Sequence, residues 1–147
     1  MAPKRLTVAV RGLSAAQLDT AYRPGGWSAR QVVHHVADSA LNGSARFRWA
    51  LTEDEPTIKP YDENRWAELA DSKRGAIEPS RYIVEGVTER LVVLLKTLTP
   101  KDWGRRFYHP EWKEHVRLDH LLAKLAWHHE HHVAHISLLR ARAGWKE

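Results

Sequence analysis

The chain contains no cysteine among its 147 residues, and it has no long apolar run. The missing cysteines exclude disulfide bonds, thiolate metal sites and a cysteine nucleophile. Without a long apolar run or a secretory leader, we expect a cytoplasmic protein with no membrane-spanning segment. The hydrophobic fraction of 43% is that of an ordinary globular protein rather than a disordered one. The length suits a single domain over residues 1–147.

The chain carries a modest excess of positive charge. Lysine and arginine together number 23, against 18 acidic residues, which gives a formal net charge of +5. These cations are scattered along the sequence, and no basic run is dense enough to form a tail. We therefore expect no nucleic-acid partner.

Histidine is unusually frequent, with ten in the chain. The densest group lies inside a segment of helical periodicity that continues beyond it, so it belongs to the fold and is no terminal tag. Imidazole in such numbers indicates hydrogen-bonded core histidines or a metal site. Five of the ten fall within eight positions: His128, His129, His131, His132 and His135.

Apolar residues recur at three- and four-residue spacing in three segments long enough to be helices. Ser28 and Gln31 form a capping box before the first, Pro100 ends the second, and Gly144 suits the carboxyl end of the third. The predicted helices cover 28–51, 79–99 and 119–144.

Shorter elements lie between the long helices. We expect a stub over 4–12 followed by a turn at 14–18, a short helix over 62–69 capped by Asp62, and a loop with a small hairpin over 104–116. Three long helices and one short one predict an all-α antiparallel bundle with one shortened member.

Histidines four residues apart on a helix stand one above the other and are able to bind the same ion. The pairs His128/His132 and His131/His135 have this spacing. The first pair is in phase with the apolar stripe of its helix, so we expect it to point into the bundle, whereas His131 lies off that face. The alternative is a pair of core histidines satisfied by Asp38 or by backbone groups.

A third ligand is available on the helix predicted over 28–51, where either His34 or His35 would serve. His35 shares a helical face with Asp38, Ser39 and Asn42, a polar stripe typical of a site lining. Three neutral imidazoles suit Zn²⁺ or Ni²⁺ and leave one coordination position open for water or substrate.

The pair His129-Glu130 also starts the zincin protease motif. That motif needs a second histidine four residues after the first, and the chain has Val133 there. A zincin is therefore excluded.

Six segments of the chain resemble the DinB-like four-helix bundles, and more narrowly the YfiT-like metal-dependent hydrolases, whose close relatives are described as bacillithiol S-transferases. The resemblance covers about Leu18 to Trp145. The segments are Gln-Leu-Asp-Thr-Ala-Tyr-Arg (17–23), Gly-Gly-Trp-Ser (25–28), Gln-Val-Val-His-His-Val-Ala-Asp-Ser (31–39), Pro-Tyr-Asp-Glu (60–63), Phe-Tyr-His-Pro (107–110) and Trp-His-His-Glu-His-His-Val-Ala-His-Ile (127–136).

This resemblance implies a DinB-like four-helix bundle, a homodimer and three metal ligands at His35, His128 and His132. The chain departs from the family at its amino terminus, where a full first helix is usual and only 4–12 is available. A shortened first helix would leave an exposed apolar groove, which a homodimer would cover.

Taken with the resemblance, the residues favour a bacillithiol-type thiol S-transferase that binds one divalent metal ion per chain, zinc before nickel. In this hypothesis the metal lowers the pKa of a low-molecular-weight thiol and presents the thiolate to an electrophilic substrate. The missing cysteine agrees with a borrowed nucleophile. Asp38 would orient a histidine or a bound water, and Arg23 and Tyr61 would contact the acidic groups of the thiol.

Three alternatives stay open. The same ion would support hydrolysis of an amide or ester without any thiol. A non-catalytic metal-binding module of a stress response would bind metal without turnover. A helical bundle with satisfied core histidines would bind no metal at all.

Overall fold

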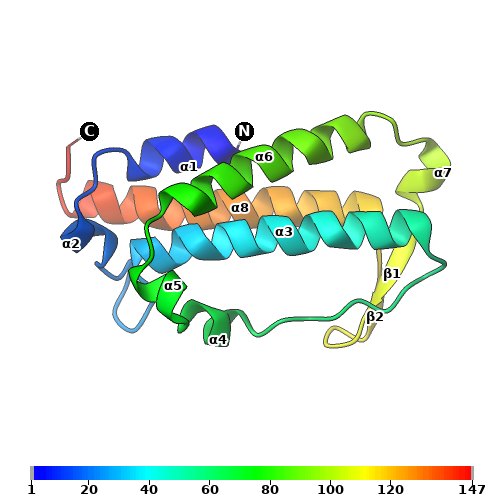
Figure 1. Ribbon diagram of the computed structural model, residues 1–147, viewed down its shortest axis with the longest axis horizontal. Helices are drawn as coiled ribbons and strands as arrows, with labels where there is room; N and C mark the ends of the chain where they lie inside the picture. Colours follow the sequence, from blue (N-terminus) through cyan, green and yellow to red (C-terminus); the bar gives the residue numbers. More distant parts are fainter. Residues whose placement is uncertain (1, 147) are drawn as a thin grey trace.

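Four helices, α1, α3, α6 and α8, form a bundle in the computed structural model, which describes residues 2–146 (Figure 1). Short helices and a two-stranded sheet connect them. Within these residues the elements are, in order, α1 (Ala2–Val10), α2 (Ala15–Leu18), α3 (Ala29–Thr52), α4 (Glu63–Ala67), α5 (Ala70–Arg74), α6 (Glu78–Leu95), α7 (Pro100–Trp103), β1 (Arg106–His109), β2 (Glu114–Arg117) and α8 (Leu118–Arg142).

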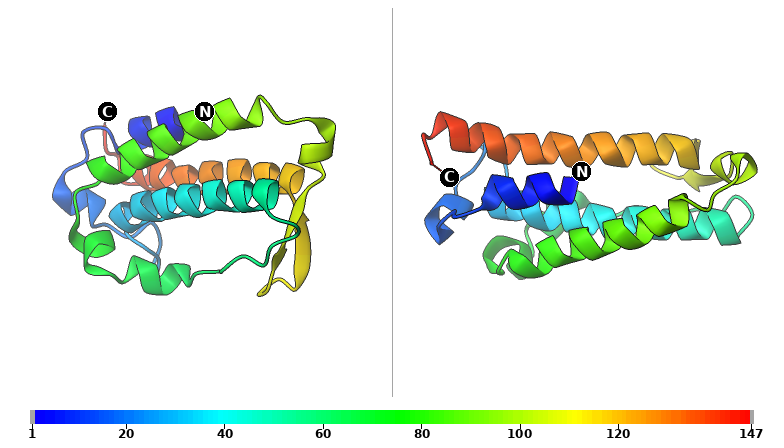
Figure 2. Two further views of the ribbon diagram at one scale, coloured as in Figure 1. Left: turned by 45° about the vertical axis from the view of Figure 1, so that its right-hand side comes forward. Right: turned by 90° about the horizontal axis from the view of Figure 1, so that it is seen from above.

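Helices α3 and α6 run in one direction along the bundle, and α1 and α8 run in the opposite direction (Figures 1 and 2). Both α3 and α1 pack against α6 and α8. Segment 53–77, which carries α4 and α5, returns along the bundle before α6 begins. The four-helix bundle expected from the sequence is therefore confirmed, as two parallel pairs packed antiparallel. None of the helices within residues 2–146 is long and apolar enough to cross a membrane.

Helix α3 begins where its capping box predicts. The Gln31 N–H donates to Ser28 Oγ, and the Ser28 N–H donates to the Gln31 side-chain oxygen. At the far end of the chain, Gly144 follows α8 with φ of 68°, a left-handed conformation that favours glycine after a helix.

The helix predicted over 79–99 is shorter in the structure, because α6 ends at Leu95. Thr99 instead caps the next helix, with its hydroxyl accepting a hydrogen bond from the Asp102 N–H, and Pro100 occupies the first turn of α7.

The small hairpin predicted within 104–116 is formed by β1 and β2, which pair antiparallel with Phe107 opposite Val116. The segment after α3 joins this hairpin. The Ile58 N–H donates to the Tyr108 carbonyl at 3.1 Å, and the Tyr108 N–H donates to the Pro56 carbonyl at 2.9 Å. These bonds fix the hairpin to the segment that leads into α4.

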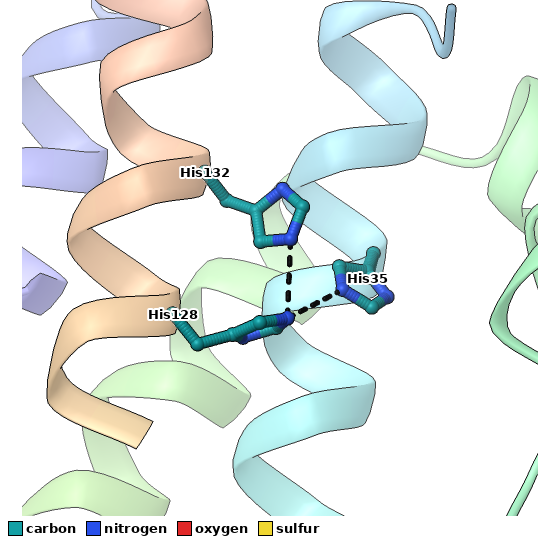
Figure 3. Close-up of side chains that lie close together, drawn as sticks. All are labelled: His35, His128 and His132. Carbon is teal, nitrogen blue, oxygen red and sulfur yellow. Dashed lines mark hydrogen bonds between the residues drawn. The ribbon is translucent and has the colours of Figure 1, made fainter. Parts of the chain in front are cut away.

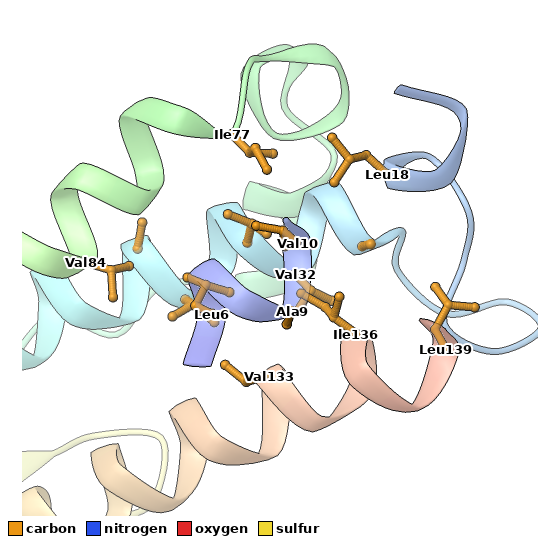
Figure 4. Packing of buried hydrophobic residues seen from close by; sticks show 14 residues of the cluster. Leu6, Ala9, Val10, Leu18, Val32, Ile77, Val84, Val133, Ile136 and Leu139 are labelled. Carbon is orange, nitrogen blue, oxygen red and sulfur yellow. The ribbon is translucent and has the colours of Figure 1, made fainter. Parts of the chain in front are cut away.

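Buried hydrophobic side chains form two clusters at opposite ends of the bundle. One joins α1 to the amino-terminal half of α3 and the carboxyl end of α8 (Figure 4). The other joins the end of α3 to the hairpin and the start of α8. Representative members are Leu6, Val32 and Ile136 in the first, and Phe47, Phe107, Leu118 and Leu121 in the second.

Helix α1 has nine residues, whereas α3 has 24 and α8 has 25. It therefore covers only part of the bundle (Figure 2). Beyond it a groove of about 260 Å³ lies between α6 and α8, as expected for a shortened first helix. The homodimer expected to cover this groove stays a prediction. The groove is lined mainly by apolar residues that include Val87, Leu91, Leu95, Leu122 and Leu125.

Replacing Leu6 tests whether short α1 stabilises the bundle. Leu6 is 1% exposed in the core, while Val8 on the same helix is 42% exposed. We expect Leu6→Ala to lower the free energy of unfolding by about 2–5 kcal/mol, because a cavity remains in the core, and Val8→Ala to change it by less than about 0.5 kcal/mol. Urea unfolding measures both. Equal losses in the two variants would contradict the packing described for α1.

Candidate metal centre

Three imidazole rings from two helices meet between α3 and α8, with His35 buried and His128 and His132 half-buried (Figure 3). His35 comes from α3, and His128 and His132 lie one turn apart on α8. The His128 Nε2 is 3.1 Å from the His35 Nε2 and 3.1 Å from the His132 Nε2. Each residue offers a nitrogen within 4.8 Å of those of the other two. The structure thus brings together the three residues predicted as metal ligands.

The close approach of α3 to α8 places these rings within reach of one another. Gly43 on α3 is buried, and a Cβ there would lie 2.6 Å from Leu125 Cδ1 on α8. A larger residue at this position would displace Leu125 or separate the helices. The four-residue spacing of His128 and His132 then turns both side chains toward α3.

All three rings are held in the neutral form. Burial lowers the pKa of His35 to about 4, with a smaller effect from His129. Burial lowers the pKa of His128 to about 3 and that of His132 to about 2, and neighbouring histidines add to both shifts. Neutral imidazole is the form that binds a metal.

The donor set fits a borderline divalent ion. Tetrahedral zinc holds histidine nitrogens at about 2.0–2.1 Å, which sets neighbouring nitrogens about 3.3 Å apart. The two separations of 3.1 Å at His128 match this spacing. Within residues 2–146, no carboxylate oxygen joins the cluster of three histidines. His35, His128 and His132 are therefore suited to hold zinc or nickel and to leave a position open.

Ser39 orients one of the three rings. Its Oγ lies 3.2 Å from the His128 Nδ1, and in the tautomer with Nδ1 protonated this N–H donates to the hydroxyl. The lone pair of the His128 Nε2 is then free to face the other two histidines. The buried Nδ1 of His132 has no partner within residues 2–146.

Aromatic rings cover the cluster at the His132 end. The Trp27 ring centroid is 4.8 Å from that of His35 and 6.2 Å from that of His132. Next to them, Tyr22 stacks on His135 at 4.1 Å. These contacts place aromatic rings along this side of the cluster.

Other histidines have separate roles. His34 turns toward α6, where its Nδ1 lies 2.7 Å from Ser80 Oγ, so His35 alone of this adjacent pair belongs to the cluster. His131 is exposed, as its helical phase predicts. His129 is 8% exposed, more buried than the ligand pair, and its position four residues after Leu125 and four before Val133 would have shown this.

The residues predicted to assist the site lie at different distances from it. Asp38 is half-buried on α3, but no hydrogen bond joins it to the three histidines in the described chain, and Ser39 contacts His128 instead. Arg23 donates to the Tyr22 hydroxyl at the His132 end. Tyr61 lines a small pocket beside His128 at the other end. The roles of Asp38, Arg23 and Tyr61 stay predictions.

Two residues at the site were missed from the sequence. Arg46 and Lys124 line the same pocket as Tyr61 and His128. Arg46 continues the polar face of His35, Ser39 and Asn42 at helical spacing, so its position on that face was available from the sequence. Lys124 comes four residues before His128 on α8, so helical spacing would likewise have placed it on the face of His128.

Family membership is indicated by a model described as the DinB superfamily, which matches residues 1–136. YfiT of Bacillus subtilis, named "Putative metal-dependent hydrolase YfiT", is 47% identical over 143 residues, which cover 97% of this chain and 80% of YfiT. A "Putative metal-dependent hydrolase" of Bacillus cereus is 49% identical over 97% of this chain and 82% of that protein.

Solved structures share the bundle. The structure of YfiT from Bacillus subtilis, described as having an unusual four-helix bundle topology, has a TM-score of 0.97 and 46% identity, covering 99% of this chain and 83% of that chain. A mycothiol-dependent maleylpyruvate isomerase has a TM-score of 0.71 and 18% identity, covering 92% of this chain and 56% of that chain. At 18% identity, the similarity to the isomerase shows a shared fold and nothing more.

The lowered histidine pKa values predict how acid affects the metal-free protein. Unfolded histidine has a pKa of about 6.5, so between pH 6.5 and about 4 the unfolded chain binds protons that the folded cluster does not. Well above pH 6.5 these histidines therefore do not lower the free energy of unfolding. As the pH drops from 6.5 toward 4, they lower it progressively. We expect His132→Gln to make the free energy of unfolding less dependent on pH in this window, and Ser137→Ala, an exposed change of α8 that alters no titratable group, to leave the slope unchanged. Urea unfolding at several pH values measures this, and identical slopes for His132→Gln and wild type would contradict it.

The hydrogen bond of Ser39 predicts an effect on metal affinity. Removing the partner of a ligating histidine weakens metal binding about 10–100-fold. We expect Ser39→Ala to show such a loss in a chelator competition with zinc, and Ser137→Ala, an exposed change on α8, to show none. Unchanged affinity in Ser39→Ala would remove the role given to this hydroxyl.

Proposed function

The chain belongs to the DinB superfamily and, within it, to the YfiT-like proteins, and from this membership we propose that it is an enzyme that depends on one divalent metal ion per chain. The single observation that supports this most strongly is the convergence of the Nε2 atoms of His35, His128 and His132. We propose zinc as the ion, with nickel as the alternative.

A bound metal of this kind lowers the pKa of a coordinated thiol or water and so supplies a nucleophile near neutral pH. Three protein ligands leave a position for that group, as catalytic zinc sites do and structural sites do not. The chain itself supplies no cysteine nucleophile. A thiol bound from solution would supply the sulfur nucleophile that the chain lacks.

We propose that this nucleophile is a low-molecular-weight thiol of the bacillithiol type and that the enzyme is a thiol S-transferase. A thiol has a pKa of about 8.5, whereas bulk water has a pKa of about 15.7. Ionising the thiol needs a much smaller shift, and it needs no carboxylate base at the cluster. No carboxylate is among the clustered groups of residues 2–146, which favours a thiol over water as the nucleophile.

The residues of the chain have distinct tasks in this proposal. Ser39 orients the His128 ring through a hydrogen bond to its Nδ1, and Trp27 packs beside the rings of His35 and His132. Arg23 and Tyr61 lie at opposite ends of the cluster, where they would contact acidic groups of the thiol. Burial raises the pKa of Tyr61, so its hydroxyl remains a hydrogen-bond donor.

Hydrolysis of an amide or ester is the second candidate. The names of the YfiT relatives favour it. Asp38 adds a further observation, since burial and then the nearby Asp71 raise its pKa to about 6, a value suited to general acid–base work. In this case Asp38 would exchange a proton with the attacking water or the leaving group.

Metal analysis with a matched pair of variants tests the proposal. We expect protein purified without a histidine tag to contain about one zinc or nickel per chain. His132→Ala should lose this metal. His131→Ala, the exposed neighbour on the same helix, should keep it. If wild type binds neither metal after loading and dialysis, the proposal of a metalloenzyme is wrong.

A paired assay then separates the two activities. Thiol transfer is followed as chloride displacement from monochlorobimane by bacillithiol, and hydrolysis is followed with p-nitrophenyl acetate without thiol. We expect metal-dependent transfer that His132→Ala abolishes. Metal-dependent hydrolysis with no transfer would replace the transferase with the hydrolase, and metal binding without either activity would favour a non-catalytic module.

A further inference from the structure

A small pocket of about 70 Å³ lies directly beside His128, on the side away from Trp27. Its lining residues belong to α3, to α8, to the segment that leads into and begins α4, and to the turn of the β1–β2 hairpin. Its walls thus come from four parts of the chain that are distant in sequence. Its polar and aromatic lining includes Asn42, Arg46, Tyr61, Glu63, Trp112 and Lys124.

Arg46 brings a partly buried charge to this pocket without a compensating partner. Its Nε is buried and makes no hydrogen bond within residues 2–146. No ion pair of Arg46 is found in the same part of the chain. A buried guanidinium donor that lacks a partner carries a desolvation cost, which a bound acceptor would offset.

Lys124 adds a second cation from α8. Its Nζ lies 3.0 Å from the centroid of the Trp112 ring, which holds the ammonium at the pocket wall. Trp112 in turn stacks on buried His109 at 3.7 Å. Burial lowers the pKa of His109 to about 4, with smaller effects from Arg46 and Lys124, so this ring adds no charge near neutral pH.

Glu63 is the one carboxylate among the described residues that line the pocket. It lies opposite the two cations without forming an ion pair to either within residues 2–146. The lining carries two cations against this one anion, and two carboxylates outside the lining also act on the cations, Glu111 on Arg46 and Glu114 on Lys124. Asn42 and Tyr61 add neutral side chains able to donate hydrogen bonds.

We propose that this pocket binds a carboxylate group of the substrate, with Arg46 and Lys124 as its charged contacts. A guanidinium donates paired N–H groups to a carboxylate, and a nearby ammonium adds attraction at that position. A substrate held here lies against His128, one of the three clustered histidines. This inference rests on the proposed function, because that function places the reaction at His35, His128 and His132.

The carboxylate belongs to one of two sources, a carboxylated thiol or a carboxylated amide or ester. Both kinds of substrate carry the carboxylate that Arg46 would bind. Mercaptosuccinate and N-acetylaspartate carry two carboxylates each, on a thiol and on an amide. The zinc-loaded protein is expected to bind one of them more tightly, which identifies the source, and Arg46→Gln is expected to weaken that binding about tenfold.

Succinate binding to the metal-free protein tests the pocket independently of the metal. Succinamide has the same shape without charge. We expect succinate to bind at least about tenfold more tightly, and the Arg46 Nε–H resonance to shift on binding as it gains an acceptor. Arg46→Gln should abolish this preference, and Lys124→Gln should reduce it. Arg48→Gln, which removes an arginine of α3 that bonds to Ser44, should preserve it.

The outcomes separate the two proposals. Loss of the succinate preference in folded Arg46→Gln, with zinc content still one per chain, supports the carboxylate pocket. Equal binding of succinate and succinamide, or an unchanged preference in both Arg46→Gln and Lys124→Gln, overturns it. Because the succinate measurement needs no metal, failure of wild type to bind zinc would overturn the proposed function and leave this result standing. Circular dichroism confirms that each variant is folded, and Arg46→Lys, which keeps the charge, is expected to retain part of the preference.

Discussion

The packing of α3 against α8 is the constraint on which the site depends. Gly43 allows Leu125 to approach α3 at a distance that a Cβ would prevent. At that separation the His128 Nε2 lies 3.1 Å from the Nε2 of His35 and 3.1 Å from the Nε2 of His132. A small outward shift of α8 would leave the three imidazoles without a common ligand position. The hydrophobic clusters at the two ends of the bundle hold the helices at this spacing.

This arrangement has a cost in the metal-free protein. Burial holds the three rings neutral, and the buried Nδ1 of His132 has no partner within residues 2–146. Arg46 adds another buried donor without a partner, close to the same site. Unsatisfied polar groups in a folded protein concentrate where a ligand binds. The pocket beside Arg46 is also lined by His128, so it adjoins the histidine cluster.

Local signals predicted much of the fold and of the histidine cluster. The capping box at Ser28 located the start of α3, and helical phase separated His128 and His132 from exposed His131. The end of α6 was predicted too late, because the Thr99 cap belongs to the next helix. The choice between His34 and His35 depends on Ser80, a long-range contact that adjacent histidines do not reveal. The pocket was beyond prediction because its walls come together only in the folded chain.

X-ray absorption at the metal edge tests the central claim most directly. Protein loaded with one equivalent of zinc should show three imidazole nitrogens at about 2.0–2.1 Å and one further light ligand. A carboxylated thiol that binds as proposed should replace this light ligand with sulfur at about 2.3 Å, with the three imidazoles retained. Fewer than three imidazoles in wild type, or a spectrum that His132→Ala leaves unchanged, would contradict the assignment of His35, His128 and His132 as the metal ligands.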